Sequence, residues 1–385
     1  MANIWNTESW RHYPNAQEIH YRNQVQLRDV LALLRQKPAI VKANEINALK
    51  KHLAAASDGR SFILQAGDCA ESITAASPKT TQAQLTLITK LAKLLEQKLN
   101  KPVVSIARIA GQFAKPRTKT HETRAGISLL SYRGDLVNHI DFTPESREPN
   151  SARLLQGYAK AAHTYKVLKR KSSQSIYTSH EALHLHYESS FTRKVYNLST
   201  HLPWLGMRTA QIDGAHVEYL RGIKNPIGIK VGPSTTPEQL QVLLTKLNPE
   251  HAPGRILLIT RLGADKIELI LPRLILAVTK LGMPVTWSCD PMHGNTFRTE
   301  SGLKTRDFAT IATELALAFQ VHASEKSILG GIHLEITPEA VTECIGGQCG
   351  LSIQDLNQNY RTLLDPRLNA SQAIELAEGL ILQGF

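Results

Sequence analysis

The 385-residue sequence has few cysteines and no long apolar run. Four cysteines are too few for a disulfide framework in a chain of this length. Cys344 and Cys349 have no second pair nearby to complete a structural zinc site. Apolar runs such as 256–259 and 274–278 fall well short of the roughly 18 residues that span a bilayer. Because residues 1–10 also show no export or organelle signal, we expect a cytoplasmic protein.

Aromatic residues are scarce, at 6%, whereas basic residues are in excess, with 45 Lys and Arg against 33 Asp and Glu. The basic residues are scattered, and the sequence has neither an RNP-like nor a C₂H₂ pattern, so nucleic-acid binding is not favoured. The net charge of +12 instead suits a local site for small phosphorylated or carboxylated molecules.

Strand and helix patterns alternate along most of the chain. Apolar residues at helical spacing predict an N-terminal helical extension over residues 1–60, and Ser77-Pro78 is a helix-start signal. Residues 112–150 are polar and predict a long functional loop. Eight strands are predicted at 61–66, 103–109, 175–179, 202–205, 227–231, 255–260, 285–288 and 328–336. This order predicts one α/β domain, a (β/α)8 TIM barrel over 61–340, with a C-terminal segment at 341–385.

Cationic residues recur where the predicted strands end. Arg108, Arg208, Lys230 and Arg261 stand at the ends of four strands. Lys115-Pro116-Arg117-Thr118 follows the second strand in a loop. Cations that converge on one barrel mouth repel each other unless anions fill the space between them. The pattern therefore predicts a site for phosphate and carboxylate groups, with Glu181 facing it from the third strand.

A second group has the side chains of metal ligands. It consists of Cys69, His293, Glu335 and Asp365, which follow or end strands or precede the last helix. One thiolate, one imidazole and two carboxylates suit Mn²⁺, Co²⁺, Fe²⁺ or Zn²⁺ better than Mg²⁺. Sequence spacing alone does not group these four residues, and packing roles for the cysteine and the histidine remain the alternative.

The run His180-Glu181-Ala182-Leu183-His184 matches the H-E-x-x-H pattern of zinc proteases. That chemistry needs both histidines on one face of a helix, whereas residues 175–179 just upstream have a strand pattern. We therefore place Glu181 at a strand end and give His184 and His186 surface or packing roles, with a zinc protease as the alternative from another class.

Several long motifs, in chain order, resemble those of the type II 3-deoxy-D-arabino-heptulosonate 7-phosphate (DAHP) synthases. They occupy residues 65–71, 108–117, 179–183, 213–216, 228–233, 289–296 and 365–369. The resemblance extends from about Trp10 to the last helix. It implies a decorated (β/α)8 barrel that condenses phosphoenolpyruvate with erythrose 4-phosphate and water, releasing phosphate, as the first step towards chorismate.

The resemblance also implies a role for each candidate residue. It assigns a divalent metal (Mn²⁺ or Co²⁺, with Zn²⁺, Fe²⁺ or Cd²⁺ as alternatives) to Cys69, His293, Glu335 and Asp365. It assigns phosphoenolpyruvate to Arg108, Glu181, Arg208, Lys230 and Arg261, and the sugar phosphate to Lys115, Arg117 and Thr118. Arg108, Lys115 and Glu181 are the expected catalytic residues. We expect Lys115 to donate a proton to the developing alkoxide, because neighbouring cations lower the pKa of a lysine.

The sequence departs from the family pattern at Met207, Ala210 and Leu364. The first two leave open an amino-DAHP synthase that uses an imino or amino analogue of erythrose 4-phosphate. The stretch from Arg108 to Glu181 also lacks the helical insertion of larger members, so we expect weak or absent feedback inhibition by Phe, Tyr or Trp. Such a member would suit a secondary-metabolite route, for example to phenazines. The resemblance further implies a homo-oligomer, a dimer or larger.

Overall fold

The barrel predicted from the alternating pattern is present in the computed structural model, which describes residues 4–172 and 175–379. Its strands are β1 (Phe62–Gly67), β2 (Val103–Arg108), β5 (Tyr177–Glu181), β8 (Leu202–Leu205), β9 (Ile227–Val231), β10 (Ile256–Thr260), β11 (Thr286–Cys289) and β14 (Leu329–Glu335). They are parallel and neighbour one another in chain order, and β14 pairs with β1 to close the barrel. This confirms the (β/α)8 fold, and each strand begins and ends within two residues of its predicted range.

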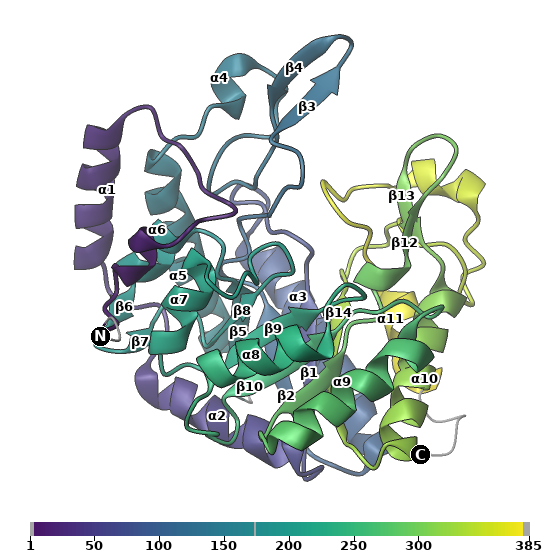
Figure 1. The fold of residues 1–385 in the computed structure, drawn as a ribbon. Coiled ribbons are helices and arrows are strands. Elements are labelled where there is room, and N and C mark those ends of the chain that lie inside the picture. The colour runs from purple at the N-terminus through teal and green to yellow at the C-terminus, as the bar shows by residue number, and fades with distance from the viewer. Residues whose placement is uncertain (1–3, 173–174, 380–385) are drawn as a thin grey trace.

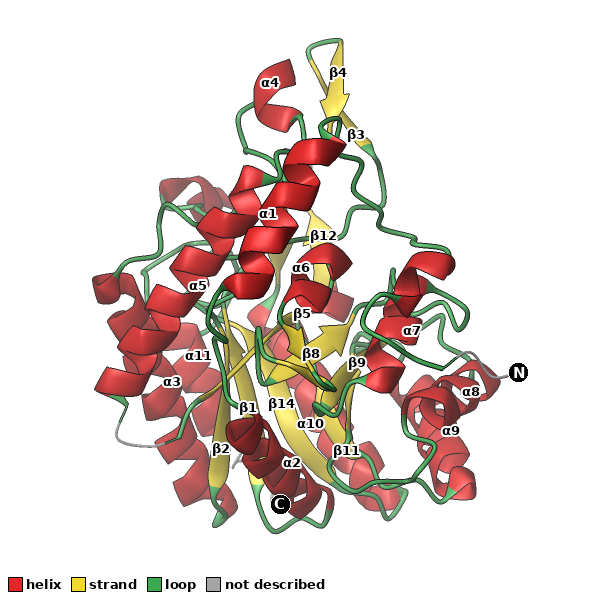
Figure 2. Ribbon diagram, turned by 90° about the vertical axis from the view of Figure 1, so that its left-hand side faces the viewer, coloured by secondary structure: helices red, strands yellow, loops and turns green. Residues whose placement is uncertain are grey.

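Helices surround the barrel (Figures 1 and 2). They are α3 (Pro78–Leu99), α5 (Ala152–Lys171), α6 (Leu185–Ser190), α7 (Ala215–Gly222), α8 (Pro237–Leu247), α9 (Ile267–Leu281), α10 (Phe308–Ser324) and α11 (Ala370–Gly379). The predicted start signal is confirmed at α3, where the Ser77 side chain accepts a hydrogen bond from Thr80 N and Pro78 occupies the first turn. Across the described residues, none of the helices has both the length and the apolar character needed to cross a membrane.

The predicted N-terminal extension folds into α1 (Gln24–Gln36) and α2 (Ala43–Ser57), after a short 3-10 turn, η1 (Ser9–His12). Helix α2 covers the amino end of the barrel, where Leu49 and Leu53 join a cluster of inward-facing apolar side chains that includes Ile63 and Ile106. This end is therefore a packed apolar floor. Residues 1–3 of the predicted extension and 380–385 of the predicted C-terminal segment lie outside the described residues.

Two hairpins rise from the carboxyl end of the barrel, one on each side (Figure 1). One pairs β3 (His121–Arg124) with β4 (Ile127–Leu130), and the other pairs β12 (Thr296–Arg298) with β13 (Lys304–Arg306). The prediction of an irregular loop over 112–150 was thus wrong in part, since this stretch holds the first hairpin and α4 (Pro144–Arg147). Ala125 and Gly126 both have positive φ, at 46° and 80°, which lets a two-residue turn join the strands.

Four short elements complete the described chain. Strands β6 (Thr192–Arg193) and β7 (Tyr196–Asn197) pair after α6. The 3-10 turn η2 (His293–Asn295) follows β11, and η3 (Ile353–Gln358) lies between β14 and α11. Of these, η2 bears directly on the site, because it begins at a predicted metal ligand.

Candidate active site

The carboxyl ends of the strands surround a cavity of about 1380 Å³, walled by the two hairpins. Ten of the twelve predicted site residues line it: Arg108, Lys115, Arg117, Thr118, Glu181, Arg208, Lys230, Arg261, His293 and Asp365. The other two, Cys69 and Glu335, are buried beside it, with 1% and 0% of their surfaces exposed. The structure thus gathers all of the predicted residues at one end of the barrel.

Strand register explains why residues far apart in sequence meet here. Gly67, at the end of β1, pairs with Arg108 of β2 on one side and with Glu335 of β14 on the other. Gly67 has φ +150°, and a Cβ at this position would lie 2.7 Å from the Arg108 carbonyl oxygen. Only glycine therefore allows β1 to end between these two side chains and deliver Cys69 to the site.

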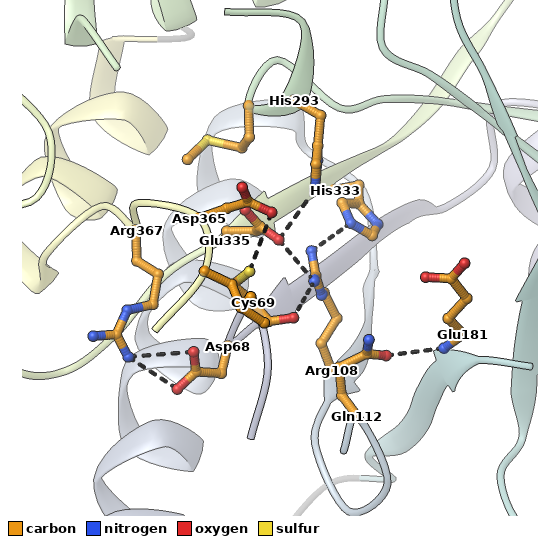
Figure 3. Close-up of polar contacts among 12 residues, drawn as sticks. Asp68, Cys69, Arg108, Gln112, Glu181, His293, His333, Glu335, Asp365 and Arg367 are labelled. Carbon is orange, nitrogen blue, oxygen red and sulfur yellow. Dashed lines mark hydrogen bonds and ion pairs between the residues drawn. The ribbon is translucent and has the colours of Figure 1, made fainter. Parts of the chain in front are cut away.

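The four predicted metal ligands converge (Figure 3). Cys69, Glu335 and Asp365 each offer a ligand atom within 4.8 Å of the others. The Cys69 thiol lies 3.5 Å from Asp365 Oδ2, and His293 Nε2 lies 3.2 Å from Glu335 Oε1. Asp365 reaches this group because Leu368, three residues further on, pairs with Ile336 just after β14.

Asp290 holds His293 in its orientation. Its carboxylate accepts hydrogen bonds from the backbone N–H of Met292 and of His293, at 3.0 and 3.2 Å, and from His293 Nδ1 at 2.7 Å. With Nδ1 directed at Asp290, Nε2 is directed at Glu335. A carboxylate that orients a histidine in this way is the usual outer partner of a metal ligand. The donor set and its support therefore fit a divalent cation.

Buried cations keep the carboxylate of Glu335 ionised. Burial alone would raise the pKa of Glu335, but His293, Arg108 and Arg306 outweigh it and hold that pKa well below its usual range. Arg108 and Arg306 each approach one carboxylate oxygen, both at 2.9 Å. By contrast, burial and the Glu335 charge raise the pKa of the Cys69 thiol, so a metal that binds the thiolate must displace a proton.

Asp365 is also ionised. Burial opposes its charge, but Lys115 and other nearby cations outweigh burial and lower the pKa of Asp365. Lys304 Nζ lies 2.7 Å from its Oδ1, and Lys115 Nζ lies 3.5 Å from its Oδ2. The expectation that Lys115 has a lowered pKa is wrong. Although burial lowers it, the acidic groups around it, Cys69, Asp365 and Glu335, outweigh burial, and the pKa of Lys115 is raised.

The cations predicted to bind phosphoenolpyruvate line the cavity. Lys230 is buried and forms an ion pair with Asp290. Burial lowers the pKa of Lys230 to about 8, partly offset by Asp290. Arg261 donates to the His293 carbonyl at 2.8 Å, and Arg208 donates to Thr118 Oγ1 at 2.9 Å. Arg261 therefore contacts the turn that holds His293, and Arg208 contacts the loop predicted to receive the sugar phosphate.

Glu181 ends β5 and faces this set of cations. Its Oε1 is buried and has no hydrogen-bond partner among the described residues. Burial raises the pKa of Glu181, while Lys115, Arg208 and Lys230 oppose the rise. Its backbone N–H donates to Gln112 Oε1 at 2.9 Å (Figure 3). An orphaned carboxylate oxygen among cations is suited to contact substrate or water.

The loop predicted to receive the sugar phosphate is braced by the N-terminal segment. Arg117 N donates to Gln17 Oε1 at 2.9 Å, and Gln17 Nε2 donates to the Arg117 carbonyl at 3.2 Å. Arg133 donates to the Gln17 carbonyl at 2.8 Å and to that of Glu18 at 2.7 Å. The Arg117 side chain pairs with Glu122 at 2.6 Å. The described part of the extension therefore supports this part of the cavity wall without lining the cavity itself.

The H-E-x-x-H run does not form a zinc-protease site. His180 lies in β5 and its Nε2 is 2.8 Å from Glu188, whereas His184 caps α6 and its Nε2 is 2.7 Å from the Tyr21 hydroxyl. The two histidines are not on one helical face, so the protease alternative is wrong. The expected packing role of His184 is confirmed, since only 3% of its surface is exposed.

Sequence reasoning missed the residues that support the site. They are Asp290, Lys304, Arg306, His333 and Gln112. A signal existed for His333, which stands two residues before Glu335 in the same strand and so faces the same side of the sheet. Asp290 lies within the family motif at residues 289–296, but nothing in the sequence showed that it contacts His293.

A closed parallel barrel whose strand ends gather cations, carboxylates, an imidazole and a thiol is the architecture of an enzyme that acts on small anionic substrates. Comparison with known proteins makes this class specific. The model of the class-II DAHP synthetase family matches residues 5–175 and 168–381. The chain belongs to this family, and it is an enzyme.

Curated relatives agree with that assignment. A Streptomyces coelicolor protein named phospho-2-dehydro-3-deoxyheptonate aldolase is 40% identical over 427 residues, covering 96% of this chain and 95% of its own. A Neurospora crassa protein of the same name is 38% identical over 448 residues, covering 97% and 93%. A solved structure of this aldolase from Francisella tularensis matches with a TM-score of 0.55 and 16% identity, covering 92% of this chain and 97% of its own, which supports the fold alone.

Proposed function

We propose that this enzyme condenses phosphoenolpyruvate with D-erythrose 4-phosphate and water, giving DAHP and inorganic phosphate, at a site that holds a divalent metal ion. The observation that carries the proposal is the meeting, at one end of the barrel, of the Cys69, His293, Glu335 and Asp365 donor set with the strand-end cations that line the cavity. A family relationship supports the reaction, and the donor set supports Mn²⁺ or Co²⁺.

The side chains divide between the two substrates. Arg208, Lys230 and Arg261 bind the phosphate and carboxylate of phosphoenolpyruvate and stabilise the phosphate as it leaves. On the other side, Lys115, Arg117 and Thr118 bind the sugar phosphate. When bound, the metal supplies Lewis acidity towards the aldehyde oxygen.

Glu181 acts at C2 of phosphoenolpyruvate in the proposed reaction. C3 of phosphoenolpyruvate forms a bond to the aldehyde carbon, water adds at C2, and the C2–O bond to phosphate breaks. Positive charge develops at C2 before water adds. Glu181, whose Oε1 lacks a partner within the described chain, stabilises that charge or orients the water. The two protons of the attacking water go to the alkoxide, which becomes a hydroxyl, and to the departing phosphate, while the Lys115 ammonium, 3.5 Å from Asp365 Oδ2, stabilises the alkoxide as it develops.

The product would enter chorismate biosynthesis, and we propose that it supplies aromatic amino acids or a secondary route such as phenazines. The amino-DAHP alternative remains the second candidate, because Met207, which lines the cavity, stands where many members of the family have an acidic residue. An enzyme that consumes phosphoenolpyruvate only with the imino or amino analogue would establish that alternative.

Metal removal tests the proposal. We expect loss of phosphoenolpyruvate to require erythrose 4-phosphate, to stop after treatment with a chelator, and to return with Mn²⁺ or Co²⁺. Cys69→Ser should lower turnover by about 100-fold, because a ligand is lost. Cys349→Ser, which changes an exposed thiol outside the cavity, is the matched control. Full turnover in the chelated enzyme, or equal loss in both variants, would contradict the metal assignment.

A further inference from the structure

We propose that His333 is a positioning residue that aims Arg108 and Lys230 at the substrate cavity, accepting a hydrogen bond from each through a neutral ring protonated at Nδ1. The proposal rests on the proposed function in one respect, that these two cations bind phosphoenolpyruvate. It assigns a tautomer and a role to a residue that does not itself line the cavity.

The environment of Nε2 decides the protonation of the ring. His333 is fully buried, and its Nε2 lies 2.7 Å from Arg108 Nη1 and 2.8 Å from Lys230 Nζ. Arginine and lysine side chains have only donors, so Nε2 must present its lone pair to both. A proton on Nε2 would set N–H against N–H, and a ring protonated at both nitrogens would also bring a third positive charge into contact with two others.

The other ring nitrogen confirms this arrangement. Nδ1 lies 2.8 Å from Gln65 Oε1, and the β1–β14 register pairs the two residues directly. Nδ1 therefore carries the proton and donates it to the Gln65 oxygen. Reversing the Gln65 amide would not change the tautomer, because the two cations would still face Nε2. It would only set the Gln65 NH₂ against the ring N–H.

The hydrogen bonds continue away from the cavity with one direction. Gln65 Nε2 donates to Ser179 Oγ at 3.1 Å, and Ser179 Oγ donates to the Ala107 carbonyl at 3.3 Å. Gln65, Ser179 and Ala107 are all fully buried. The series of hydrogen bonds ends at the backbone carbonyl of Ala107, one residue before Arg108. Because a carbonyl can only accept, it fixes the direction of the hydrogen bonds in the series. The His333 ring is held against rotation from its rear side.

A shared acceptor is needed because each cation also has a carboxylate to contact. Arg108 donates to Glu335 at 2.9 Å and to the Cys69 carbonyl at 3.3 Å, and Lys230 pairs with Asp290. Glu335 is itself a predicted metal ligand, and Asp290 contacts the predicted ligand His293. Without the Nε2 acceptor, each cation would turn towards its own carboxylate. We therefore expect weaker phosphoenolpyruvate binding, with the metal ligands intact.

Two substitutions separate the role of the acceptor from that of ring packing. In His333→Gln, the side-chain oxygen can take the place of Nε2 and accept from both cations. In His333→Asn, the shorter amide can replace Nδ1, and nothing replaces Nε2. Phosphoenolpyruvate binding to the metal-loaded full-length enzyme, measured by calorimetry, should weaken about 10- to 100-fold in His333→Asn and by less than about threefold in His333→Gln.

The same enzymes give readouts that a purely structural role would not divide in this way. KM for erythrose 4-phosphate and affinity for Mn²⁺ should stay close to wild type in both variants. His201→Asn is the matched control, because His201 is an equally buried barrel histidine outside the cavity lining. It should lower the unfolding temperature without changing phosphoenolpyruvate affinity.

The tautomer itself is measured by NMR on protein labelled with ¹⁵N at histidine, with the His333 signals identified by their loss in the variants. A protonated Nδ1 and an unprotonated Nε2 support the proposal. A proton on Nε2, or equal weakening of phosphoenolpyruvate binding in both variants, would overturn it. Wild-type enzyme that fails to consume the two substrates would instead contradict the proposed function, because the tautomer is read without turnover.

Discussion

Glu314 and Glu335 are both fully buried glutamates, yet their surroundings drive their pKa values in opposite directions. Two arginines face Glu335 and keep it ionised. Glu314, in α10, faces no cation at salt-bridge distance within the described chain and accepts from Leu262 N, Gly263 N and Asn295 Nδ2 at 2.7–2.9 Å. Burial raises the pKa of Glu314 to about 7, because these neutral donors only partly offset it.

This raised pKa predicts a pH-dependent stability. Between the ordinary value of 4.5 and about 7, folded protein keeps a proton on Glu314 that unfolded protein has released. The free energy of unfolding should therefore fall as pH rises through this window, by up to about 3 kcal/mol from this group. Denaturant unfolding of wild type and Glu314→Gln at several pH values measures the effect.

The informative quantity is how the difference between the two proteins changes with pH. Glutamine cannot titrate, so the free energy of unfolding of Glu314→Gln should lack the fall with pH that Glu314 causes in wild type. The unfavourable contact of its amide with the Asn295 donor lowers the stability of the variant by the same amount at every pH, and this constant amount does not alter how the difference between the two proteins changes with pH. A difference that stays flat from pH 4.5 to 7.5 would show that Glu314 titrates normally.

Sequence reasoning located the residues that touch the cavity but not the residues that hold them. Charged residues at strand ends are visible in sequence, because parallel strands deliver their carboxyl ends to one face. The direction of the pKa shift at Lys115 could not be predicted from the sequence. It depends on the carboxylates of Glu335 and Asp365, which lie more than 200 residues away along the chain. The pairing of Arg306 with Glu335 depends equally on tertiary structure.

Among the elements, the N-terminal segment gives a prediction about one substrate alone. The side-chain amide of Gln17 forms two hydrogen bonds with the backbone of Arg117, in the loop predicted to receive the sugar phosphate. We expect Gln17→Ala to raise KM for erythrose 4-phosphate about three- to tenfold, because these bonds hold the loop in place. KM for phosphoenolpyruvate should remain unchanged. Steady-state kinetics with each substrate varied in turn measures both.

Gln26→Ala is the control for this prediction, since Gln26 is exposed on α1 and does not line the cavity. It should leave both KM values at wild-type levels. An equal rise in both KM values for Gln17→Ala would indicate a general disturbance of the cavity and would contradict a role confined to the sugar-phosphate loop.

Elements with apolar patterns were predictable, whereas those with polar patterns were not. The barrel strands are buried runs of apolar residues, and the capping residues of α3 and α8 are local signals. Hairpin β3–β4 was missed because its strand His121–Arg124 is polar and mostly exposed, so no alternation marks it. Its one local signal, the turn at Ala125-Gly126, is weak without flanking apolar residues.

At the scale of the whole molecule, the length of the excursion between β2 and β5 bears on regulation. Within the described residues it holds only hairpin β3–β4, α4 and α5. We predict that Phe, Tyr and Trp, singly or together at millimolar concentration, change the rate by less than about fivefold, the lower end of ordinary allosteric coupling. Initial rates at subsaturating substrate measure this. A larger effect of tryptophan would reveal an effector site outside this excursion.

Glu335, between Arg108 and Arg306, has a consequence for how the enzyme acquires its ion. In a zinc finger the ligands repel one another until metal arrives, so folding waits for the ion. Here the strands fix the ligands, and arginines compensate the buried charge, so the empty protein has no reason to unfold. If the site binds a divalent ion as we propose, the folded enzyme could take up that ion, or exchange it for another, without unfolding and without new protein synthesis.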